Sequence, residues 1–144
     1  MKQRALLLGV LAAIVFGLMA WTERISGVPV GPWIFMASSL TSQLFDILAA
    51  LMLAVALAIG LVRLGARRSP DASPTLNLLS WVAPTFGLLA GAREGSIIWT
   101  TAQMVHVTHF RVVAPTVVEA LLMPLLGLLA GLVAAAFAAA PTRT

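Results

Sequence analysis

The chain has no cysteine and no tyrosine, and only 10% of its 144 residues are charged. Without cysteine, neither a disulfide framework nor a thiolate metal site can form. Soluble domains have about 25% charged residues, whereas this chain is 60% hydrophobic and has a mean hydropathy of +1.02. These values predict an integral membrane protein and leave no room for a soluble domain.

Motifs of enzyme chemistry are also missing. The sequence contains no Gly-rich phosphate loop after a strand, no nucleophile elbow and no carboxylate pair in a soluble cleft. His106 and His109 could share a helix face, but no third histidine and no cysteine can complete a metal or haem site. We therefore expect no enzyme activity, no cofactor and no metal. The net charge of +4 does not indicate nucleic acid, because the basic residues sit between hydrophobic runs as topology signals.

Four hydrophobic segments are expected to be helices, because an open strand edge is not viable in lipid. They cover residues 5–21, 33–62, 76–99 and 113–140. Because these segments and their short connections use up nearly the whole chain, we expect residues 1–144 to form a single membrane domain. The second segment is too long for one straight crossing, and its polar first turns are expected at the interface or among other helices. The first also has the layout of a secretory signal. We favour a retained anchor, because Leu18 makes the site after Ala20 a poor cleavage site.

The basic residues predict the orientation, since Lys and Arg in short loops favour the cytoplasmic side. With the amino terminus inside, the cytoplasmic side holds Lys2, Arg4, Arg63, Arg67, Arg68 and Arg143, and the outside holds Arg24 and Arg111. Both termini are therefore predicted to be cytoplasmic. The aromatic anchors would then be Trp21, Trp33 and Trp99 near the outer interface and Trp81 near the inner one.

Small residues recur three or four positions apart on three of the segments. The edges are Ala83, Gly87, Gly91 and Gly95; Ala120, Pro124, Gly127 and Gly131; and Gly9, Ala13 and Gly17. Helices in lipid associate through close van der Waals contact, for which such edges are suited. They are either packing surfaces within one chain or contacts between chains, and three such helices suggest a homo-oligomer.

Four ionisable residues are expected at membrane depth, namely Asp46, Arg93, Glu94 and Glu119. A charge at the bilayer centre costs roughly 2.5–3.5 kcal/mol. Asp46 shares a polar helix face with Ser39, Ser42 and Gln43, which should point at protein or water. Arg93 and Glu94 are about 100° apart around the helix, so we expect each to pair with another helix or to reach outward. Structural roles and a role in an ion pathway are both open.

Two of these segments, SWVAPTFGLLAG and VVAPTVVEALLMPLLGLLAGL, resemble the paired signature of the MotA/TolQ/ExbB proton channel family. The matching positions are Ala83, Pro84, Gly87, Leu88 and Leu89, followed by Glu119, Ala120, Leu121, Gly127 and Leu128. The resemblance covers about residues 80–140 and, more loosely, residues 31–68. The topology predicted from the basic residues agrees with that of the family.

The resemblance implies a ring-forming subunit, typically a pentamer, in the bacterial inner membrane. The ring would surround a single-helix partner of the MotB/TolR/ExbD kind, which supplies the proton-carrying aspartate. The candidate ion-pathway residues are then Glu119, Thr85, Thr116, Ser96 and Asp46. Two features depart from the family: Gly91 and Pro124 stand where it has threonine, and a short stretch around ARRSPDASP replaces its large cytoplasmic region.

Two other hypotheses stay open. The same scaffold could be a non-conducting structural or assembly subunit of a larger membrane complex. A small four-helix multidrug-type exporter fits the length of the chain. Such exporters resemble one another in a membrane-embedded Glu in the first helix, which ALLLGVLAAIVFGLMAW lacks.

Overall fold

The computed structural model describes residues 2–27, 39–65, 73–106 and 109–140. The helices in these ranges are α1 (Lys2–Ser26), α3 (Leu40–Gly65), α4 (Ser73–Met104) and α5 (Phe110–Ala139). Each of the four is long and apolar enough to cross a membrane. The prediction of an all-helical, multi-pass membrane protein is confirmed.

The helix ends differ from the expected ones, mostly because polar residues continue the helices. The third helix extends past Trp99 to Met104, and the Thr100 hydroxyl donates to the Ser96 carbonyl oxygen at 3.0 Å within it. Much of the expected outer loop is therefore helical. In the second segment the described helix begins at Leu40, and the polar turns expected at 33–38 lie outside the described residues.

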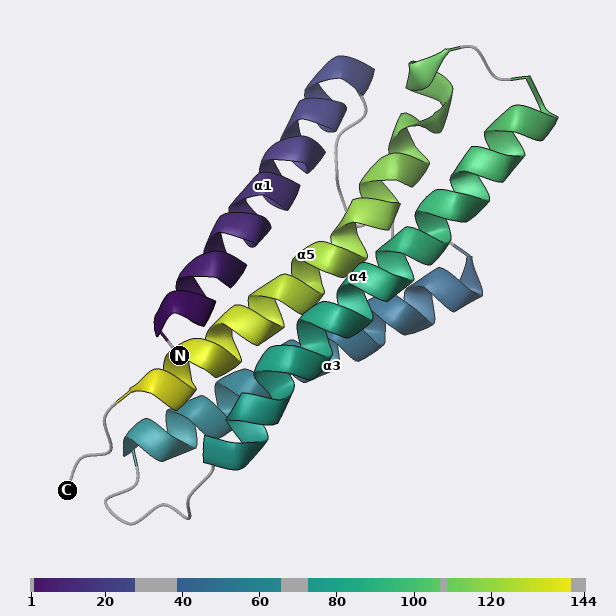
Figure 1. Ribbon diagram of the computed structural model, residues 1–144. Coiled ribbons are helices and arrows are strands. Elements are labelled where there is room, and N and C mark those ends of the chain that lie inside the picture. Colours follow the sequence, from purple (N-terminus) through teal and green to yellow (C-terminus); the bar gives the residue numbers. More distant parts are fainter. Residues whose placement is uncertain (1, 28–38, 66–72, 107–108, 141–144) are drawn as a thin grey trace.

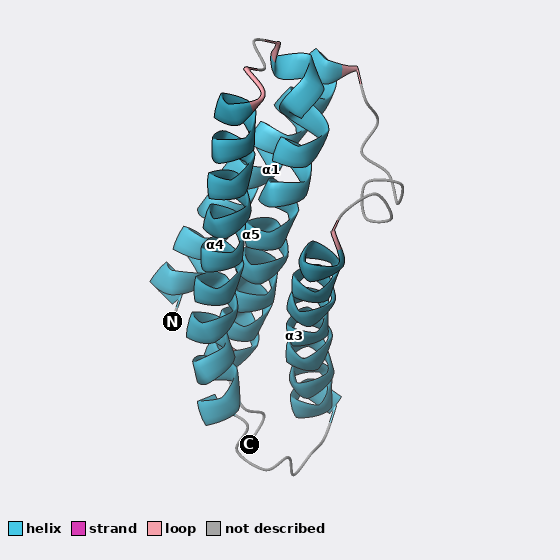
Figure 2. Ribbon diagram, turned by 90° about the vertical axis from the view of Figure 1, so that its right-hand side faces the viewer, coloured by secondary structure: helices cyan, strands magenta, loops and turns pink. Residues whose placement is uncertain are grey.

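The four helices alternate in direction, and α5 contacts each of the other three (Figure 1). The start of α1 and the end of α5 lie at one end of the bundle, which we call the termini end; the turn between α4 and α5 marks the far end. Figure 2 shows α3 to one side of the other helices, with its first turn below the upper ends of α4 and α5. That the termini end faces the cytoplasm stays a prediction.

The interface between α4 and α5, which we call the α4–α5 seam, is the closest helix contact. Gly87 faces Gly127 across it, and a Cβ atom added to Gly87 would lie 2.7 Å from the Met123 carbonyl oxygen. A Cβ atom added to Gly127 would lie 2.5 Å from the Ala83 carbonyl oxygen. These atoms belong to the backbone and cannot rotate away, so glycine is required at both positions.

Two prolines fit into the same seam. Pro84 and Pro124 lie inside α4 and α5, where a proline ring costs a backbone hydrogen bond. The Pro84 ring packs on Gly131, and a Cβ atom added to Gly91 would lie 2.7 Å from Cδ of Pro124. Each ring therefore occupies space that a glycine on the partner helix leaves open.

The predicted small-residue edges contribute unequally to packing. Those of α4 and α5 meet in the seam, except for Gly95, which has no atom within 4 Å of an added Cβ. On α1, Gly9 lies beside Leu132, whereas Ala13 and Gly17 are exposed. Helix α1 instead packs on α5 through an apolar cluster that includes Leu8, Ala12, Met19, Val118, Leu125 and Leu128.

Polar contacts tie the helices together near the termini end. The Arg4 guanidinium donates to Oδ1 of Asn77 at 2.9 Å and lies 4.1 Å from the centroid of the Trp81 ring. The Arg63 guanidinium donates to the Phe137 carbonyl oxygen at 2.8 Å, in the last turn of α5. The bond from Arg63 gives a partner to a carbonyl oxygen in the last turn of α5, where helix carbonyls lack intrahelical partners.

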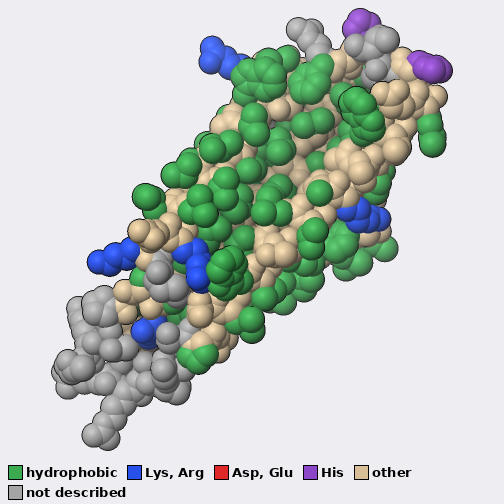
Figure 3. Space-filling view, viewed as in Figure 1, with side chains coloured by type: hydrophobic (Ala, Val, Ile, Leu, Met, Phe, Trp, Pro, Cys, Tyr) green, Lys and Arg blue, Asp and Glu red, His purple; other side chains and the backbone are tan. Residues whose placement is uncertain are grey.

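The outer surface suits a bilayer. Large apolar side chains are exposed on all four helices, and they dominate the face shown in Figure 3. Trp21 and Trp99 are exposed in the far halves of α1 and α4, and Trp81 is exposed near the termini end. This distribution matches the predicted aromatic anchors, with Trp33 outside the described residues.

Candidate functional site

At the far end, α3 stands away from α4 and α5 and leaves a cavity of about 600 Å³, which we call the α3 cleft. Most of its wall is apolar and includes Ile97, Ile98, Val105, Val112 and Val113. Its polar lining consists of Ser39, Thr41, Ser42, Arg93, Glu94, Thr101, Thr116 and Glu119. The cleft thus combines apolar walls with charged groups contributed by α4 and α5.

Asp46 lies one helical turn beyond Ser42, on the face of α3 that points into the bundle. Its side chain is only 3% exposed, and neither carboxylate oxygen has a hydrogen-bond partner among the described residues. The negative charges of Glu119 and Glu94, which both line the cleft, act on this carboxylate electrostatically. Asp46 is not itself part of the cleft lining; it is buried beside the cleft, about 9 Å along α3 from Leu40 at 1.5 Å per residue.

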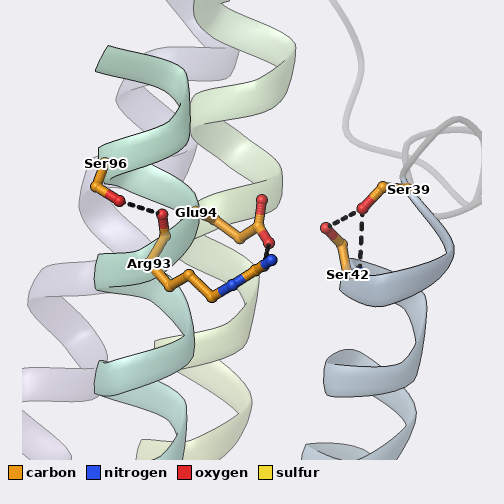
Figure 4. Close-up of polar contacts among 5 residues, drawn as sticks. All are labelled: Ser39, Ser42, Arg93, Glu94 and Ser96. Atoms are coloured by element: carbon orange, nitrogen blue, oxygen red, sulfur yellow. Dashed lines mark hydrogen bonds and ion pairs between the residues drawn. The ribbon is translucent and has the colours of Figure 1, made fainter. Parts of the chain in front are cut away.

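Arg93 and Glu94 form an ion pair, with 2.6 Å between Nη1 and Oε1. The expectation that these neighbours would not pair with each other is wrong, because the long arginine side chain spans the 100° between them. Figure 4 shows the pair directed toward the first turn of α3, which carries Ser39 and Ser42. The Arg93 guanidinium also lies 5.7 Å from the Phe45 ring centroid, a cation–π distance that links α4 to α3.

The hydroxyl groups of the cleft are fixed by local hydrogen bonds. Oγ of Ser39 caps α3 by accepting from the Ser42 backbone N–H at 3.2 Å, and the two serine hydroxyls lie 2.8 Å apart. The Thr116 hydroxyl donates to the Val113 carbonyl oxygen at 2.6 Å. The Thr116 donor is thereby used within its own helix, and one of the two serine hydroxyls donates to the other. A hydroxyl oxygen also has two lone pairs to offer as an acceptor.

The cleft gathers some of the predicted ion-pathway residues and not others. Glu119 and Thr116 line the cleft, and Asp46 is buried beside it, where the charge of Glu119 acts on its carboxylate. Thr85 instead donates to the Trp81 carbonyl oxygen at 2.8 Å and lines a shallow hollow elsewhere on α4. Ser96 is exposed outside the cleft and donates to the Arg93 carbonyl oxygen at 2.7 Å.

Thr101 and Phe45 are site residues that were not predicted from the sequence. Thr101 lies in the stretch interpreted as an outer loop, so its place in a cleft wall depends on the extension of α4. Phe45 reads as an ordinary apolar residue of a hydrophobic segment. Its tilted packing on Phe86, with ring centroids 5.6 Å apart, is a tertiary contact without a local signal.

The two histidines do not share a helix face. His106 follows the end of α4 with φ of 50°, and His109 is the N-cap of α5 in an extended conformation. Within the four described ranges, no three His, Cys, Asp or Glu side chains are grouped to hold a metal ion.

The fold and the cleft define a class of protein: a small polytopic membrane protein whose helical bundle encloses charged groups in one half. No family model, curated protein or solved structure matches the chain. The resemblance to the MotA/TolQ/ExbB family therefore stays a prediction, and the function is inferred from the cleft.

Proposed function

We propose that the chain is a subunit of an ion-driven membrane complex, and that the α3 cleft carries protons across part of the bilayer. The observation that carries the proposal is Asp46, a buried carboxylate whose two oxygens have no hydrogen-bond partner in the described residues. Keeping such a group charged is costly, and ionisable residues within membrane spans usually mark ion pathways. Asp46 would be neutral when it holds a proton and charged after releasing it.

Glu119 and Thr116 extend this site toward the far end of the bundle, and both belong to α5. The remaining thickness of the bundle is filled by the seam and by apolar packing around Ala56, Leu76 and Ala134. A complete path would thus need a surface between neighbouring subunits or a partner. The small residues Ala13, Gly17 and Gly95, exposed on the single chain, are suited to such a contact.

The pentameric ring, the single-helix partner and the bacterial inner membrane are proposed here on the strength of the family resemblance. Native mass spectrometry of the complex, extracted with its lipids, tests the ring. We expect five copies with one or two copies of a smaller protein. A single copy within a larger assembly would exclude the ring.

One observation favours the alternative of a non-conducting structural subunit. Gly91 and Pro124, which replace threonines of the family, pack directly against each other. Their contact removes hydroxyl groups from the α4–α5 seam and closes it. On this alternative the cleft would have no function and would result only from the position at which α3 packs on α4 and α5.

Proton flux into liposomes that contain the purified complex separates these functions. We expect Asp46→Asn and Glu119→Gln each to lower the flux at least tenfold, because an amide of the same shape cannot exchange a proton. Thr85→Val and Ser96→Ala are the matched controls outside the cleft and should leave it unchanged. Assembled wild-type protein that conducts no protons, or Asp46→Asn that conducts normally, would refute the proposal.

A further inference from the structure

The size and walls of the α3 cleft suit a molecule larger than a single ion. Its volume of about 600 Å³ lies within the 300–1,000 Å³ that is common for pockets binding drug-sized ligands. Seven of the fifteen residues that line it are aliphatic, all on or next to α4 and α5, and they supply most of the area of its wall. An apolar body would therefore be well accommodated between these two helices and α3.

The charges of the cleft are unbalanced. Among the side chains that the structure describes, those of Glu94 and Glu119 line the cleft and that of Asp46 is buried beside it, against one guanidinium in the lining, that of Arg93. That guanidinium is already paired with Glu94. Asp46 is buried, and neither of its oxygens has a hydrogen-bond partner among the described residues, so it favours the arrival of a positive charge.

The arrangement of these groups argues against a bare metal ion. No cluster of three His, Cys, Asp or Glu side chains in the described ranges could hold one. A cation with an apolar body needs no such convergence, since one charge can lie near Asp46 and Glu119 while its body contacts the aliphatic wall.

We propose that the α3 cleft is a binding site for an amphiphilic organic cation. The walls of α4 and α5 would contact its apolar body, and its charge would be attracted by Glu119 in the lining and by Asp46, which is buried beside the cleft. This binding proposal does not depend on whether the cleft also conducts protons. A cation bound there would occupy the proposed proton path and so block it.

Isothermal titration calorimetry of the full chain in lipid nanodiscs tests this, with tetraphenylphosphonium as the probe. Triphenylphosphine oxide, which is similarly bulky but neutral, accounts for partition into lipid. We expect saturable binding of the cation only. Asp46→Asn and Glu119→Gln should each weaken the affinity about tenfold or more, because a charge pair in a site of low dielectric constant is strong.

Two further variants distinguish loss of the binding site from loss of the folded structure. Glu23→Gln removes an acidic group on α1, outside the cleft lining, and should bind like the wild type. Thr116→Trp keeps all three carboxylates but fills the cleft, and should abolish binding while the helical circular dichroism is retained. Equal binding of the neutral compound, or unchanged affinity in both charge variants, would overturn the proposal. Binding is measured without an ion gradient, so its outcome is independent of whether the protein conducts.

Discussion

The α4–α5 seam and the α3 cleft share the helices α4 and α5 and are built in opposite ways. In the seam, glycines bring backbones so close that an added Cβ at Gly87 would lie 3.0 Å from Cα of Gly127. In the cleft, α3 stands apart and a carboxylate is buried without a partner. The seam is thus a rigid frame, and the cleft is a place where charged groups can change partners.

Gly91 and Pro124 make the comparison concrete. On the resemblance expected from the sequence, these are two separate positions at which the family has threonine. In the structure they are one contact, in which the missing side chain of Gly91 makes room for the Pro124 ring. This contact leaves no room for a polar side chain on the side of α4 that faces α5. The charged residues of α4 lie toward α3 instead.

The largest effect on stability is expected from a substitution that disrupts the α4–α5 seam. Gly87→Ala should lower the free energy of unfolding by about 1–3 kcal/mol, because its Cβ would meet backbone atoms that cannot move aside. Gly95→Ala lies on the same helix and the same predicted edge, in open space. It should be neutral or stabilising by up to about 1 kcal/mol, from helix propensity alone. Unfolding in sodium dodecyl sulfate, followed by circular dichroism, measures both; equal stabilities would contradict the account of the seam.

A second substitution, beside the cleft, is expected to raise the stability of the protein, whereas the first lowers it. Asp46→Leu should raise the free energy of unfolding by about 1–3 kcal/mol, because it removes a buried group without a hydrogen-bond partner. Ser42→Ala, one turn away, should instead be slightly destabilising, since its hydroxyl is bonded to Ser39. The same unfolding assay applies. A loss of stability in Asp46→Leu would show that the carboxylate has a stabilising partner.

The smallest effect concerns the contact between Gly91 and Pro124. Gly91→Ala should cost less in a Pro124→Ala background than in the wild type, with a coupling of about 1 kcal/mol. Removing the ring relieves only part of the clash, because the Ala120 carbonyl oxygen would still lie 2.9 Å from the new Cβ. Strictly additive effects in the double-mutant cycle would mean that the two positions are independent.

Much of the fold could be predicted because hydrophobic length and small-residue spacing are local properties. The four helices and the two small-residue edges that contain Gly87 and Gly127 follow from them, whereas the contact between these edges within one chain comes from the structure. The same spacing could not tell which edges stay unpaired, since Gly95 and Gly17 have the pattern without the contact. That difference depends on where α1 and α3 dock, which no local pattern encodes.

The candidate site was predicted in part for a similar reason. The polar face of Ser39, Ser42 and Asp46 is a helical periodicity and is visible in the sequence. The pairing of Arg93 with Glu94 depends on side-chain reach, and the grouping of Asp46 with Glu119 depends on three helices meeting. The separation of Thr85 from these residues is likewise a tertiary result.

The central claim is that the polar groups lie in a cleft open to water or ligand on the α3 side. The chain has no cysteine, so single cysteines can be introduced without other changes. Thr116→Cys lies in the cleft, and Ser96→Cys lies at a similar depth on the outside of α4. We predict that a charged, water-soluble thiol reagent modifies the Thr116→Cys protein in nanodiscs at least tenfold faster. Equal rates for the two, or faster reaction of the Ser96→Cys protein, would contradict the claim.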